Sequence, residues 1–369
     1  MIEVDSFTQC FLDQGLNYFT GVPDSTLKEW LRFLPNKEPM LINRIAANEG
    51  SAISNAAGYH LATGNIGVVY LQNSGLGNCI NPLTSLMDSD VYGIPVVMLI
   101  GWRGEPGTKD EPQHKKMGNI TEEMLAVLDI PYEILDNDYE KKINNAIKLS
   151  KSRQGPSALI VKPGSFAKNN EDNVNECLSG MIREDAIKYI VSTVKKSEII
   201  LSTTGKNTRE LYEVCSNSPR GHNNNFYNVG SMGYVSSIGL EVAIQKKDKL
   251  VYVLDGDGAL VMHMGSLAAI GNYQPKNLVH IVFDNEVHES TGNQSTLSKA
   301  INIANIMKGC NYKRVETVFE KEALLKILNG DITGPLGIVI KVKIGSRNNL
   351  GRPTDTPKDT KIRFMNWNN

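Results

Sequence analysis

The sequence predicts an α/β protein built from two parallel β-sheets, each covered by helices. Branched apolar runs such as 66–71 and 94–100 alternate with helical segments in the first half of the chain. The same alternation restarts after residue 180. The 369 residues, 41% of them hydrophobic, suffice for about two domains with buried cores. Strands that alternate with helices are typical of parallel sheets with both faces covered.

The first domain is expected to span residues 1–164. Helical patterns lie at 5–14, 48–62, 82–87 and 140–150, and strand patterns at 17–21, 66–71, 94–100 and 157–161. The 48–62 segment is rich in Ala, with Ser and Asn interspersed, and such small side chains suit a helix that packs closely on a sheet.

A linker is expected at 165–180, because this segment is polar, rich in Asn and without periodicity. The second domain, 181–369, has helical patterns at 183–195, 207–214, 233–245 and 262–272, and strand patterns at 198–202, 249–254, 278–283 and 336–342. Its tail, 346–364, carries five basic residues, and we expect either a solvated arm or an arm that closes over an anion.

Composition excludes several classes of partner and site. The net charge of −1 gives no electrostatic footprint for nucleic acid or membrane lipid. The five cysteines are scattered without a CxxC pair, so neither a zinc site nor a thioredoxin-like motif is indicated. The longest apolar run, 91–102, is too short to span a bilayer, and the N-terminus lacks a signal core. We therefore expect a cytoplasmic protein.

Two glycine-containing stretches were tested as phosphate loops, and both are weak. NSGLGNCI follows the 66–71 strand, but Ile80 stands where a dinucleotide fingerprint needs its third glycine. STTGKNT contains Gly-Lys, but Ile200 and Asn207 replace a glycine and a hydroxyl residue of the Walker loop.

The segment LVYVLDGDGALVMHMG, 250–265, is more specific, because Asp257 ends a buried strand and Asn285 ends the next one. The ends of successive parallel strands meet at one edge of the sheet. A carboxylate, an amide oxygen and a backbone carbonyl form a half-shell that suits Mg²⁺ bound to phosphate oxygens. Gly256 and Gly258 allow the backbone to approach those phosphates, and the following helix directs its N–H groups at them. Taken alone, GDG is more often a simple turn.

The Asp257–Asn285 pair resembles the binding motif of thiamine-diphosphate enzymes. The stretches GVPDS, ANEGSAIS, GWRGEPGTKDEPQHKKMG, LSTTGKNTRELYE, GSMG, ESTGNQST and LGRPTDTP are similar to the phosphonopyruvate decarboxylases and their close relatives, the sulfopyruvate decarboxylases. The resemblance covers nearly the whole chain, and it implies a pyrimidine-binding domain, a diphosphate-binding domain and no middle domain. One departure is Asp284, where the motif often has Asn.

The resemblance assigns most cofactor contacts. Glu49 is expected to hydrogen-bond the pyrimidine ring, Met232 to wedge under the cofactor, and the Gly230 carbonyl to accept from the pyrimidine amino group. The alternatives are a surface acid at a helix start for Glu49 and an ordinary core methionine for Met232. The expected Mg²⁺ ligands are Asp257, Asn285 and the carbonyl of Val287; the other expected cofactor contacts are Gly256, Gly258, Ala259, Thr204, Gly205, Gln72 and Asn73.

The same resemblance implies residues for the substrate. His114 is expected to supply a proton, with His288 as the second candidate near the substrate, and Asp24 and Ser25 either line the substrate or form a simple turn. The expected cations for a phosphonate are Arg103, Lys109, Arg347 and Arg352, for each of which a solvated charge is the alternative.

The implied activity is decarboxylation of 3-phosphonopyruvate to phosphonoacetaldehyde and CO₂, with thiamine diphosphate and Mg²⁺. The first alternative is decarboxylation of 3-sulfopyruvate, and the second is a non-catalytic α/β module that binds an anion or nucleotide. The resemblance also implies a homodimer or larger homo-oligomer, with active sites between subunits.

Overall fold

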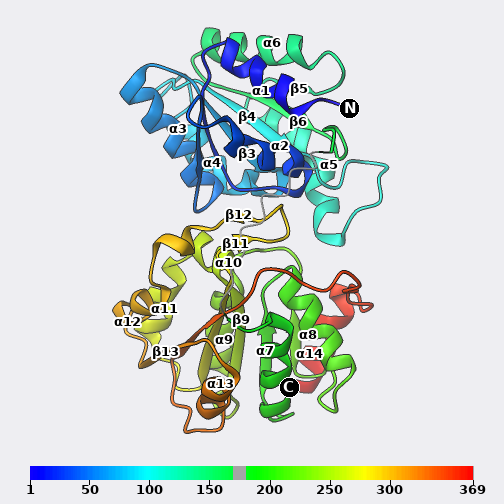
Figure 1. The fold of residues 1–369 in the computed structure, drawn as a ribbon, viewed down its shortest axis with the longest axis vertical. Helices are drawn as coiled ribbons and strands as arrows, with labels where there is room; N and C mark the ends of the chain where they lie inside the picture. The colour runs from blue at the N-terminus through cyan, green and yellow to red at the C-terminus, as the bar shows by residue number, and fades with distance from the viewer. Residues whose placement is uncertain (169–179, 369) are drawn as a thin grey trace. The chain divides into compact units, whose positions relative to one another are not determined.

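The computed structural model describes residues 1–168 and 180–368 (Figure 1). The chain divides into two compact units. The first comprises residues 1–174 with 288–295, and the second comprises 175–287 with 296–369. The expected linker, 165–180, lies mostly outside the described residues, and so does Cys177. The domain limits therefore stay a prediction, and each unit is described by itself.

The first unit contains a six-stranded parallel sheet in the order β2-β1-β3-β4-β6-β5. Its strands are β1 (Tyr18–Gly21), β2 (Ile42–Ile45), β3 (Gly67–Gln72), β4 (Val96–Gly101), β5 (Tyr132–Ile134) and β6 (Pro156–Val161). Its longer helices are α1 (Val4–Asp13), α2 (Lys28–Phe33), α3 (Glu49–Thr63), α4 (Leu76–Ser85), α5 (Pro112–Val127) and α6 (Tyr139–Arg153).

Alternate residues of the central strands supply two apolar cores, one on each face of this sheet. Val68 and Tyr70 of β3 belong to a core with Phe7 and Trp30, whereas Val69 and its neighbour Leu71 belong to the other. Because both faces are covered, β3 and β4 are continuous apolar runs, which made them visible in the sequence.

Helices α2 and α5 were not expected from the sequence, α3 agrees with the expected 48–62 within one residue, and α4 starts earlier than expected. Helix α3 begins at Glu49, and the Asn48 side chain caps it by accepting a hydrogen bond from the Ser51 backbone N–H. Helix α4 begins at Leu76 instead of residue 82, so the expected start was wrong. The glycine-containing stretch tested as a phosphate loop thus forms a short 3₁₀ turn, η3 (Asn73–Gly75), and the first turn of a helix.

The second unit repeats the plan, with a six-stranded parallel sheet in the order β13-β14-β10-β9-β7-β8. Its strands are β7 (Ile199–Ser202), β8 (Asn225–Tyr227), β9 (Val251–Gly256), β10 (Leu278–Asp284), β13 (Arg314–Val318) and β14 (Leu336–Lys341). After β10 the chain forms a two-stranded ribbon, β11 (Val287–His288) and β12 (Gln294–Ser295), of which 288–295 belong to the first unit; η4 (Leu297–Ala300) follows in the second unit.

The helices of this unit are α7 (Arg183–Thr193), α8 (Lys206–Ser216), α9 (Val235–Gln245), α10 (Asp257–Met262), α11 (Gly265–Tyr273), α12 (Ile303–Gly309), α13 (Lys321–Leu328) and α14 (Pro357–Asn368). The predicted helix at 262–272 is two helices, and α10 starts directly at Asp257. The turn between β9 and α10 is therefore very tight.

The basic tail is not a free arm, because 357–368 forms α14 and its Phe364 ring packs edge-on against Phe226, with centroids 5.7 Å apart. Arg347 forms ion pairs with Glu184 and Glu213 of the same unit. The tail is thus folded onto the second unit, which corrects the solvated arm, while an arm that closes over an anion stays a prediction.

No helix within the described residues is long and apolar enough to cross a membrane. Cys10, Cys79, Cys215 and Cys310 are free thiols.

Candidate cofactor and active site

The carboxyl edge of the second sheet brings together the acids predicted from the GDG motif. Strands β9 and β10 are in register, with Gly256 opposite Phe283. Asp257 directly follows β9 as the first residue of α10, Asp284 is the last residue of β10, and both are buried. Asn285 follows Asp284 and is also buried. The fold therefore places the Asp257 carboxylate and the Asn285 carboxamide at this edge, as the spacing predicted, and adds the Asp284 carboxylate, which it did not predict.

Two hydroxyl groups bridge the carboxylates. Thr296 Oγ1 lies 2.6 Å and Ser298 Oγ 2.8 Å from Asp257 Oδ2, while Ser298 Oγ also lies 2.9 Å from Asp284 Oδ1. The two hydroxyls are themselves 2.7 Å apart. These four contacts share only two hydroxyl protons. The cluster is therefore short of positive charge, which a cation or an added proton would supply.

The charge balance of the two carboxylates differs. Asp284 is paired with Lys341, whose Nζ lies 2.6 Å from Oδ2 and 2.9 Å from Glu286 Oε1. For Asp257, burial and then the neighbouring Asp284 raise the pKa to about 7. Two neighbouring buried carboxylates repel each other, and a bound divalent cation would offset their negative charges. The described residues contain no group of three or more His, Cys, Asp or Glu side chains suited to a metal, so a cation here would also need amide or carbonyl oxygens.

Asn285 and Val287 form a small turn at the same edge. The Val287 backbone N–H donates to Asn285 Oδ1 at 3.2 Å, which fixes the amide group. Both residues are buried. Their predicted role as metal ligands, through a side-chain oxygen and a backbone carbonyl, stays a prediction.

The GSMG turn, 230–233, is held against the end of β7. Gly230, Ser231 and Gly233 have φ of 74°, 44° and 89°, a left-handed conformation that favours glycine. The Gly230 N–H donates to Thr204 Oγ1 at 3.1 Å, and the Gly230 carbonyl accepts from the Asn228 amide at 3.1 Å. That carbonyl keeps a second lone pair for a ligand amino group.

Other predicted cofactor residues lie on the same edge of the second sheet. Met232 is half-buried, and its predicted contact with the cofactor stays a prediction. Gly205 has φ 93° at the start of α8, and Ala259 is buried in the first turn of α10 beside Gly258.

In the first unit, Glu49 is a buried acid and not a surface one. It is the first residue of α3, only 5% exposed, and its Oε2 accepts a hydrogen bond from Asn78 Nδ2 at 2.7 Å. Burial raises the pKa of Glu49, against the opposing effect of the Asn78 hydrogen bond. A carboxyl group in this setting can exchange a proton closer to neutral pH than an exposed glutamate.

Asp24 is the second buried acid of this unit, and its side chain also caps the short 3₁₀ turn η1 (Ser25–Leu27). Gln72 Nε2 donates to Oδ1 at 2.5 Å, and the Thr26 backbone N–H donates to Oδ2 at 3.0 Å. Gln72 in turn accepts from Ser74 Oγ at 2.7 Å. Burial raises the pKa of Asp24. A Cβ at Gly101, the last residue of β4, would lie 3.0 Å from Asp24 Cγ and overlap Oδ2, so glycine makes room for this carboxyl.

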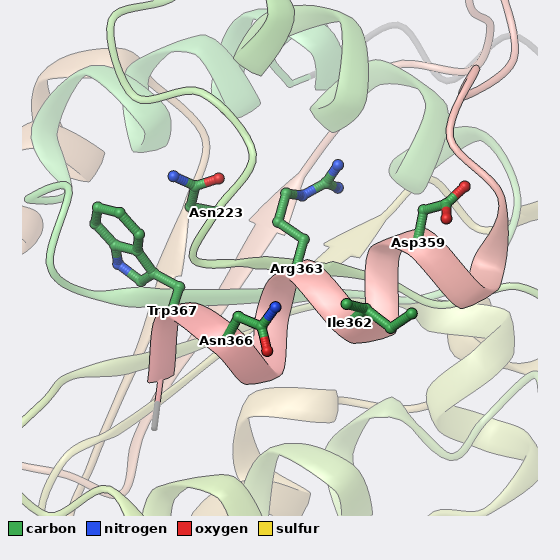
Figure 2. Close-up of a pocket in the computed structure, with 6 residues that line it drawn as sticks. All are labelled: Asn223, Asp359, Ile362, Arg363, Asn366 and Trp367. Atoms are coloured by element: carbon green, nitrogen blue, oxygen red, sulfur yellow. The ribbon is translucent and has the colours of Figure 1, made fainter.

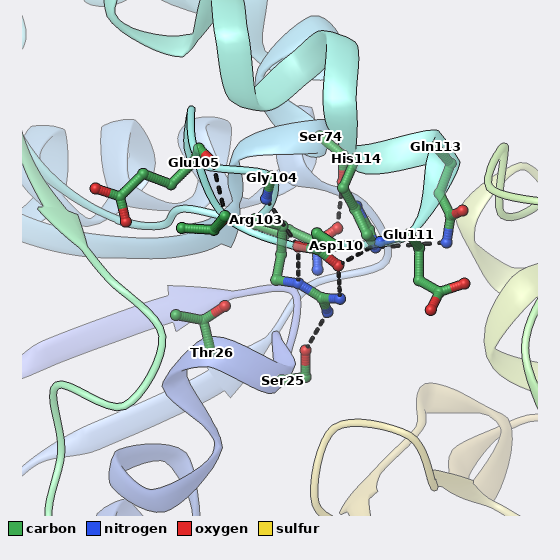
Figure 3. A network of polar contacts seen from close by, with 12 residues as sticks. Ser25, Thr26, Ser74, Arg103, Gly104, Glu105, Asp110, Glu111, Gln113 and His114 are labelled. Atoms are coloured by element: carbon green, nitrogen blue, oxygen red, sulfur yellow. Dashed lines mark hydrogen bonds and ion pairs between the residues drawn. The ribbon is translucent and has the colours of Figure 1, made fainter.

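Arg103 organises the loop after β4 (Figure 3). Its Nε and Nη2 donate to the two oxygens of Asp110 at 2.8 and 2.5 Å, and its Nη1 donates to Ser25 Oγ at 2.9 Å. Asp110 also accepts from the Gly104 backbone N–H at 2.8 Å. Asp110 thus neutralises Arg103, and the Ser25 hydroxyl, acting as acceptor toward Arg103, keeps its own proton for another group.

His114 lies beside this network, in the first turn of α5 (Figure 3). Burial and then the nearby Arg103 charge lower the pKa of His114 to about 4. At neutral pH the ring is uncharged, so it can accept a proton or donate a hydrogen bond, and it would have to be protonated first to supply a proton as expected. Its Nδ1 is buried and has no hydrogen-bond partner among the described residues. Lys109, in the loop that precedes α5, is exposed.

Asn73 makes contacts within the protein, and its expected contact with a ligand stays a prediction. It is fully buried, and its amide nitrogen donates to the Arg103 carbonyl and to Thr121 Oγ1, both at 2.9 Å. Its oxygen accepts from the Arg103 backbone N–H at 3.1 Å. The side chain therefore ties β3 to the Arg103 loop and to α5.

Three further predicted substrate residues lie outside the networks described above. Arg347 is occupied by Glu184 and Glu213, Arg352 is exposed, and His288 lies in β11 with its pKa lowered to about 4 by burial. Their role in substrate binding stays a prediction.

A separate cavity of about 480 Å³ lies beside α14, lined by Asn223, Asp359, Ile362, Arg363, Asn366 and Trp367 (Figure 2). None of the predicted site residues lines it. This cavity is therefore distinct from the groups described above.

Comparison with known proteins decides the family. Residues 4–124 match the family described as "Thiamine pyrophosphate enzyme, N-terminal TPP binding domain", and residues 203–340 match its C-terminal TPP binding domain. Together these matches cover more than half of the chain. The chain belongs to the thiamine pyrophosphate enzymes. Thiamine pyrophosphate is the same compound as thiamine diphosphate.

Among curated relatives of this thiamine pyrophosphate enzyme, the phosphonopyruvate decarboxylase of Streptomyces viridochromogenes is 34% identical, over 95% of this chain and 91% of the relative. That of Streptomyces hygroscopicus is 33% identical, over 96% of this chain and 90% of the relative. The sulfopyruvate decarboxylase subunit beta of Methanocaldococcus jannaschii is 44% identical, but over 38% of this chain and 74% of that subunit. The chain belongs to the phosphonopyruvate decarboxylase group of this family.

Several residues of the site were not found from the sequence. Thr296, Ser298 and Lys341 surround the Asp257–Asp284 pair, Asp110 holds Arg103, and Asn78 holds Glu49. ESTGNQST was noted as similar to the family, and its final Thr is Thr296, but no spacing rule connects it to Asp257.

Proposed function

We propose that this thiamine pyrophosphate enzyme decarboxylates 3-phosphonopyruvate to phosphonoacetaldehyde and CO₂. The observation that carries this proposal is the similarity, over nearly the whole chain, to two proteins named phosphonopyruvate decarboxylase. The arrangement of buried acids supports it, because each unit supplies the type of group that such a reaction needs.

The residues of the second unit fit the diphosphate end of the cofactor and its Mg²⁺. Asp257, Asn285 and the Val287 carbonyl would hold the cation, whose charge offsets the proton shortage around the two carboxylates. Gly256, Gly258 and Ala259 would lie along the phosphates, with Thr204 and Gly205 beside them. When bound, the cofactor supplies an electron sink for the carbon that loses CO₂.

The residues of the first unit fit the proton transfers. Glu49 would exchange a proton with the pyrimidine ring, because burial keeps its carboxyl from ionising too readily. Ser25 has a hydroxyl proton to donate, since Arg103 occupies its oxygen as acceptor. Asp24 and neutral His114 are the candidates for moving a proton at the substrate, and Gln72 fixes the Asp24 carboxyl.

Recognition of the phosphonate needs positive charge that is not already neutralised. Arg103 already forms an ion pair with Asp110, and it could bind the phosphonate only if both anions shared its guanidinium group. Lys109 is exposed in the same loop and is therefore a better candidate than Arg103. Arg352 and His288 are further candidates.

The decisive experiment compares turnover of 3-phosphonopyruvate by the parent and by Glu49→Gln. We expect the variant to bind thiamine pyrophosphate and Mg²⁺ with an affinity within about tenfold of the parent, and to lose turnover by about 10³-fold or more. Calorimetric titration measures binding, and trapping of the aldehyde product measures turnover. Full activity in Glu49→Gln would refute the proposed role of Glu49 in proton exchange.

The second candidate function is decarboxylation of 3-sulfopyruvate, which the 44% identity to a sulfopyruvate decarboxylase subunit favours over part of the chain. A dianion gains about one charged hydrogen bond over a monoanion, roughly 1.5–3 kcal/mol. We therefore expect kcat/KM for the phosphonate to exceed that for the sulfonate by about 10- to 150-fold. The reverse ratio would assign the sulfonate as substrate.

We also propose a homo-oligomer in which Glu49 of one subunit serves a cofactor held by a second copy. Mixing the inactive variants Glu49→Gln and Asp257→Asn, followed by subunit exchange, should then restore activity, up to about a quarter of the parent value for a dimer. No recovery after demonstrated exchange would show that each chain completes its own site.

A further inference from the structure

The stretch NSGLGNCI, 73–80, failed as a phosphate loop, yet it carries two glycines and an Asn just after the end of β3. In the structure it forms η3 and the first turn of α4, packed against the start of α3. Two of its residues, Gly75 and Asn78, lie against the Glu49 carboxyl group.

Gly75 makes room for the Glu49 side chain. A Cβ at position 75 would lie 2.5 Å from Glu49 Cδ and 2.6 Å from Cγ, closer than any real contact, and would overlap Oε1. The backbone does not require glycine there, because φ at Gly75 is −81°. The glycine is therefore explained by the space that the carboxyl group occupies.

Asn78 fixes the orientation of that carboxyl group. Its Nδ2 donates to Glu49 Oε2 at 2.7 Å. The helices are in close contact here, since a Cβ at Gly50 would lie 2.7 Å from the Asn78 carbonyl oxygen. An oxygen that accepts an N–H bond serves as the carbonyl oxygen of the neutral acid, so the acidic proton is directed to Oε1.

We propose that Gly75 and Asn78 are positioning residues for Glu49: the glycine clears the space for its carboxyl group, and the amide holds Oε2 so that Oε1 is the oxygen that exchanges a proton. The proposal rests on the proposed function for the role of Glu49 itself. It gives NSGLGNCI a task that is not phosphate binding.

A consequence for charge follows from the amide hydrogen bond. Burial raises the pKa of Glu49, and the Asn78 N–H lowers it by stabilising the carboxylate. The other titratable group that interacts with Glu49 among the described residues is the buried thiol of Cys79, whose pKa is raised by burial and by Glu49. Removing the amide should therefore raise the pKa of Glu49 further.

The first test uses the same substitution at two positions two residues apart. A Cβ at Gly77 meets nothing within 4 Å, so Gly77→Ala is the matched control for Gly75→Ala. We expect Gly75→Ala to lower kcat about 10²-fold or more with KM changed less than about threefold, because the displaced carboxyl group acts in catalysis and not in substrate binding. Gly77→Ala should keep kcat within about twofold. Equal kcat values for the two variants would overturn the role of Gly75.

The second test needs neither substrate nor cofactor, and it also applies if Gly75→Ala does not fold. Infrared difference spectroscopy of the cofactor-free protein, with Glu49→Gln subtracted, follows the protonation of the Glu49 carboxyl group with pH. We expect Asn78→Ala to raise the pKa of Glu49 by about one unit, since a charge-assisted hydrogen bond is lost. Asn78→Asp should raise it more, because an isosteric carboxylate repels the anion.

The control for this test is Asn145→Ala. The Asn145 amide donates to the Glu133 carboxylate in the same unit, so the control removes the same kind of bond elsewhere. It should leave the Glu49 pKa unchanged. An unchanged pKa in Asn78→Ala would refute the positioning role. A shifted pKa in a protein that does not act on 3-phosphonopyruvate would instead refute the proposed substrate and leave the positioning role standing.

Discussion

The two units hold buried acids at the carboxyl edges of their sheets in different ways. In the first unit, each acid has its own amide donor, Asn78 for Glu49 and Gln72 for Asp24. A glycine makes room for each, Gly75 for Glu49 and Gly101 for Asp24. These carboxyl groups are thus held singly, in closely fitted surroundings.

In the second unit the acids share their donors. Asp257 and Asp284 are bridged by Ser298, Thr296 also donates to Asp257, and Lys341 balances only Asp284. Two hydroxyl protons cannot satisfy four contacts, so this cluster needs an added positive charge. The comparison separates two tasks: a single acid with an amide donor suits proton exchange, and a pair short of protons suits a cation.

The largest expected effect tests the second cluster as a cation site. Asp257→Asn removes a carboxylate that the proposed Mg²⁺ would bind, and we expect the affinity for thiamine pyrophosphate with Mg²⁺ to fall about 10³-fold. Calorimetric titration in the presence and absence of a chelator measures this. Asp248→Asn, at an exposed position of the same unit, is the control and should bind as the parent does. Unchanged affinity in Asp257→Asn would refute the assignment of a cation site to the second unit.

A smaller effect appears in the pH dependence of stability without cofactor. Burial and Asp284 raise the pKa of Asp257 to about 7, above its value of 3.8 in the unfolded chain. The folded state then binds more protons than the unfolded state between these values, so stability is greatest at low pH and falls as pH rises toward 7.

The measurement is denaturant unfolding of the parent and of Asp257→Asn at pH 5 and pH 8, with chelator present. Asn cannot ionise, so we expect the stability of Asp257→Asn relative to the parent to increase by roughly 2–3 kcal/mol between these pH values. A difference that does not change with pH would show that Asp257 ionises as an ordinary carboxylate. Taking the difference removes the contributions of Asp24 and Glu49, which act in the same direction.

The sequence predicted the central strands of both sheets because burial on both faces makes them continuous apolar runs, as in β3, β4, β9 and β10. It missed the outer strands β2, β5, β8 and β13, which lie at or next to the sheet edges and are partly exposed. The segment that forms α14 was interpreted as an arm, because it is mostly polar and Phe226, against which its Phe364 ring packs, lies far away in the sequence.

For the site, local spacing predicted Asp257 and Asn285, since consecutive parallel strands must end at one edge. It did not predict Thr296 or Ser298. These residues follow an irregular segment after β10, and no periodic pattern in the sequence indicates that they contact Asp257. Asn78 was missed for a different reason. The helix that contains Asn78 was expected to start at residue 82. Asn78 therefore lay outside every predicted helix that could pack against α3.

The smallest expected effect tests whether Lys341 balances the charge of Asp284 in the cluster of the second unit. Lys341 is partly exposed, so its pairing with Asp284 is screened, and we expect Lys341→Met to destabilise the cofactor-free protein by about 1 kcal/mol at pH 8. In an Asp284→Asn background the same change should cost less, because one of the two carboxylates that Lys341 balances is then neutral. Lys343→Met, two residues further and exposed, should change stability by less than about 0.5 kcal/mol. Denaturant unfolding of the four members of this cycle measures the coupling. Additive effects would show that Lys341 does not stabilise the Asp284 carboxylate. Lys341 would then not offset part of the negative charge of the cluster.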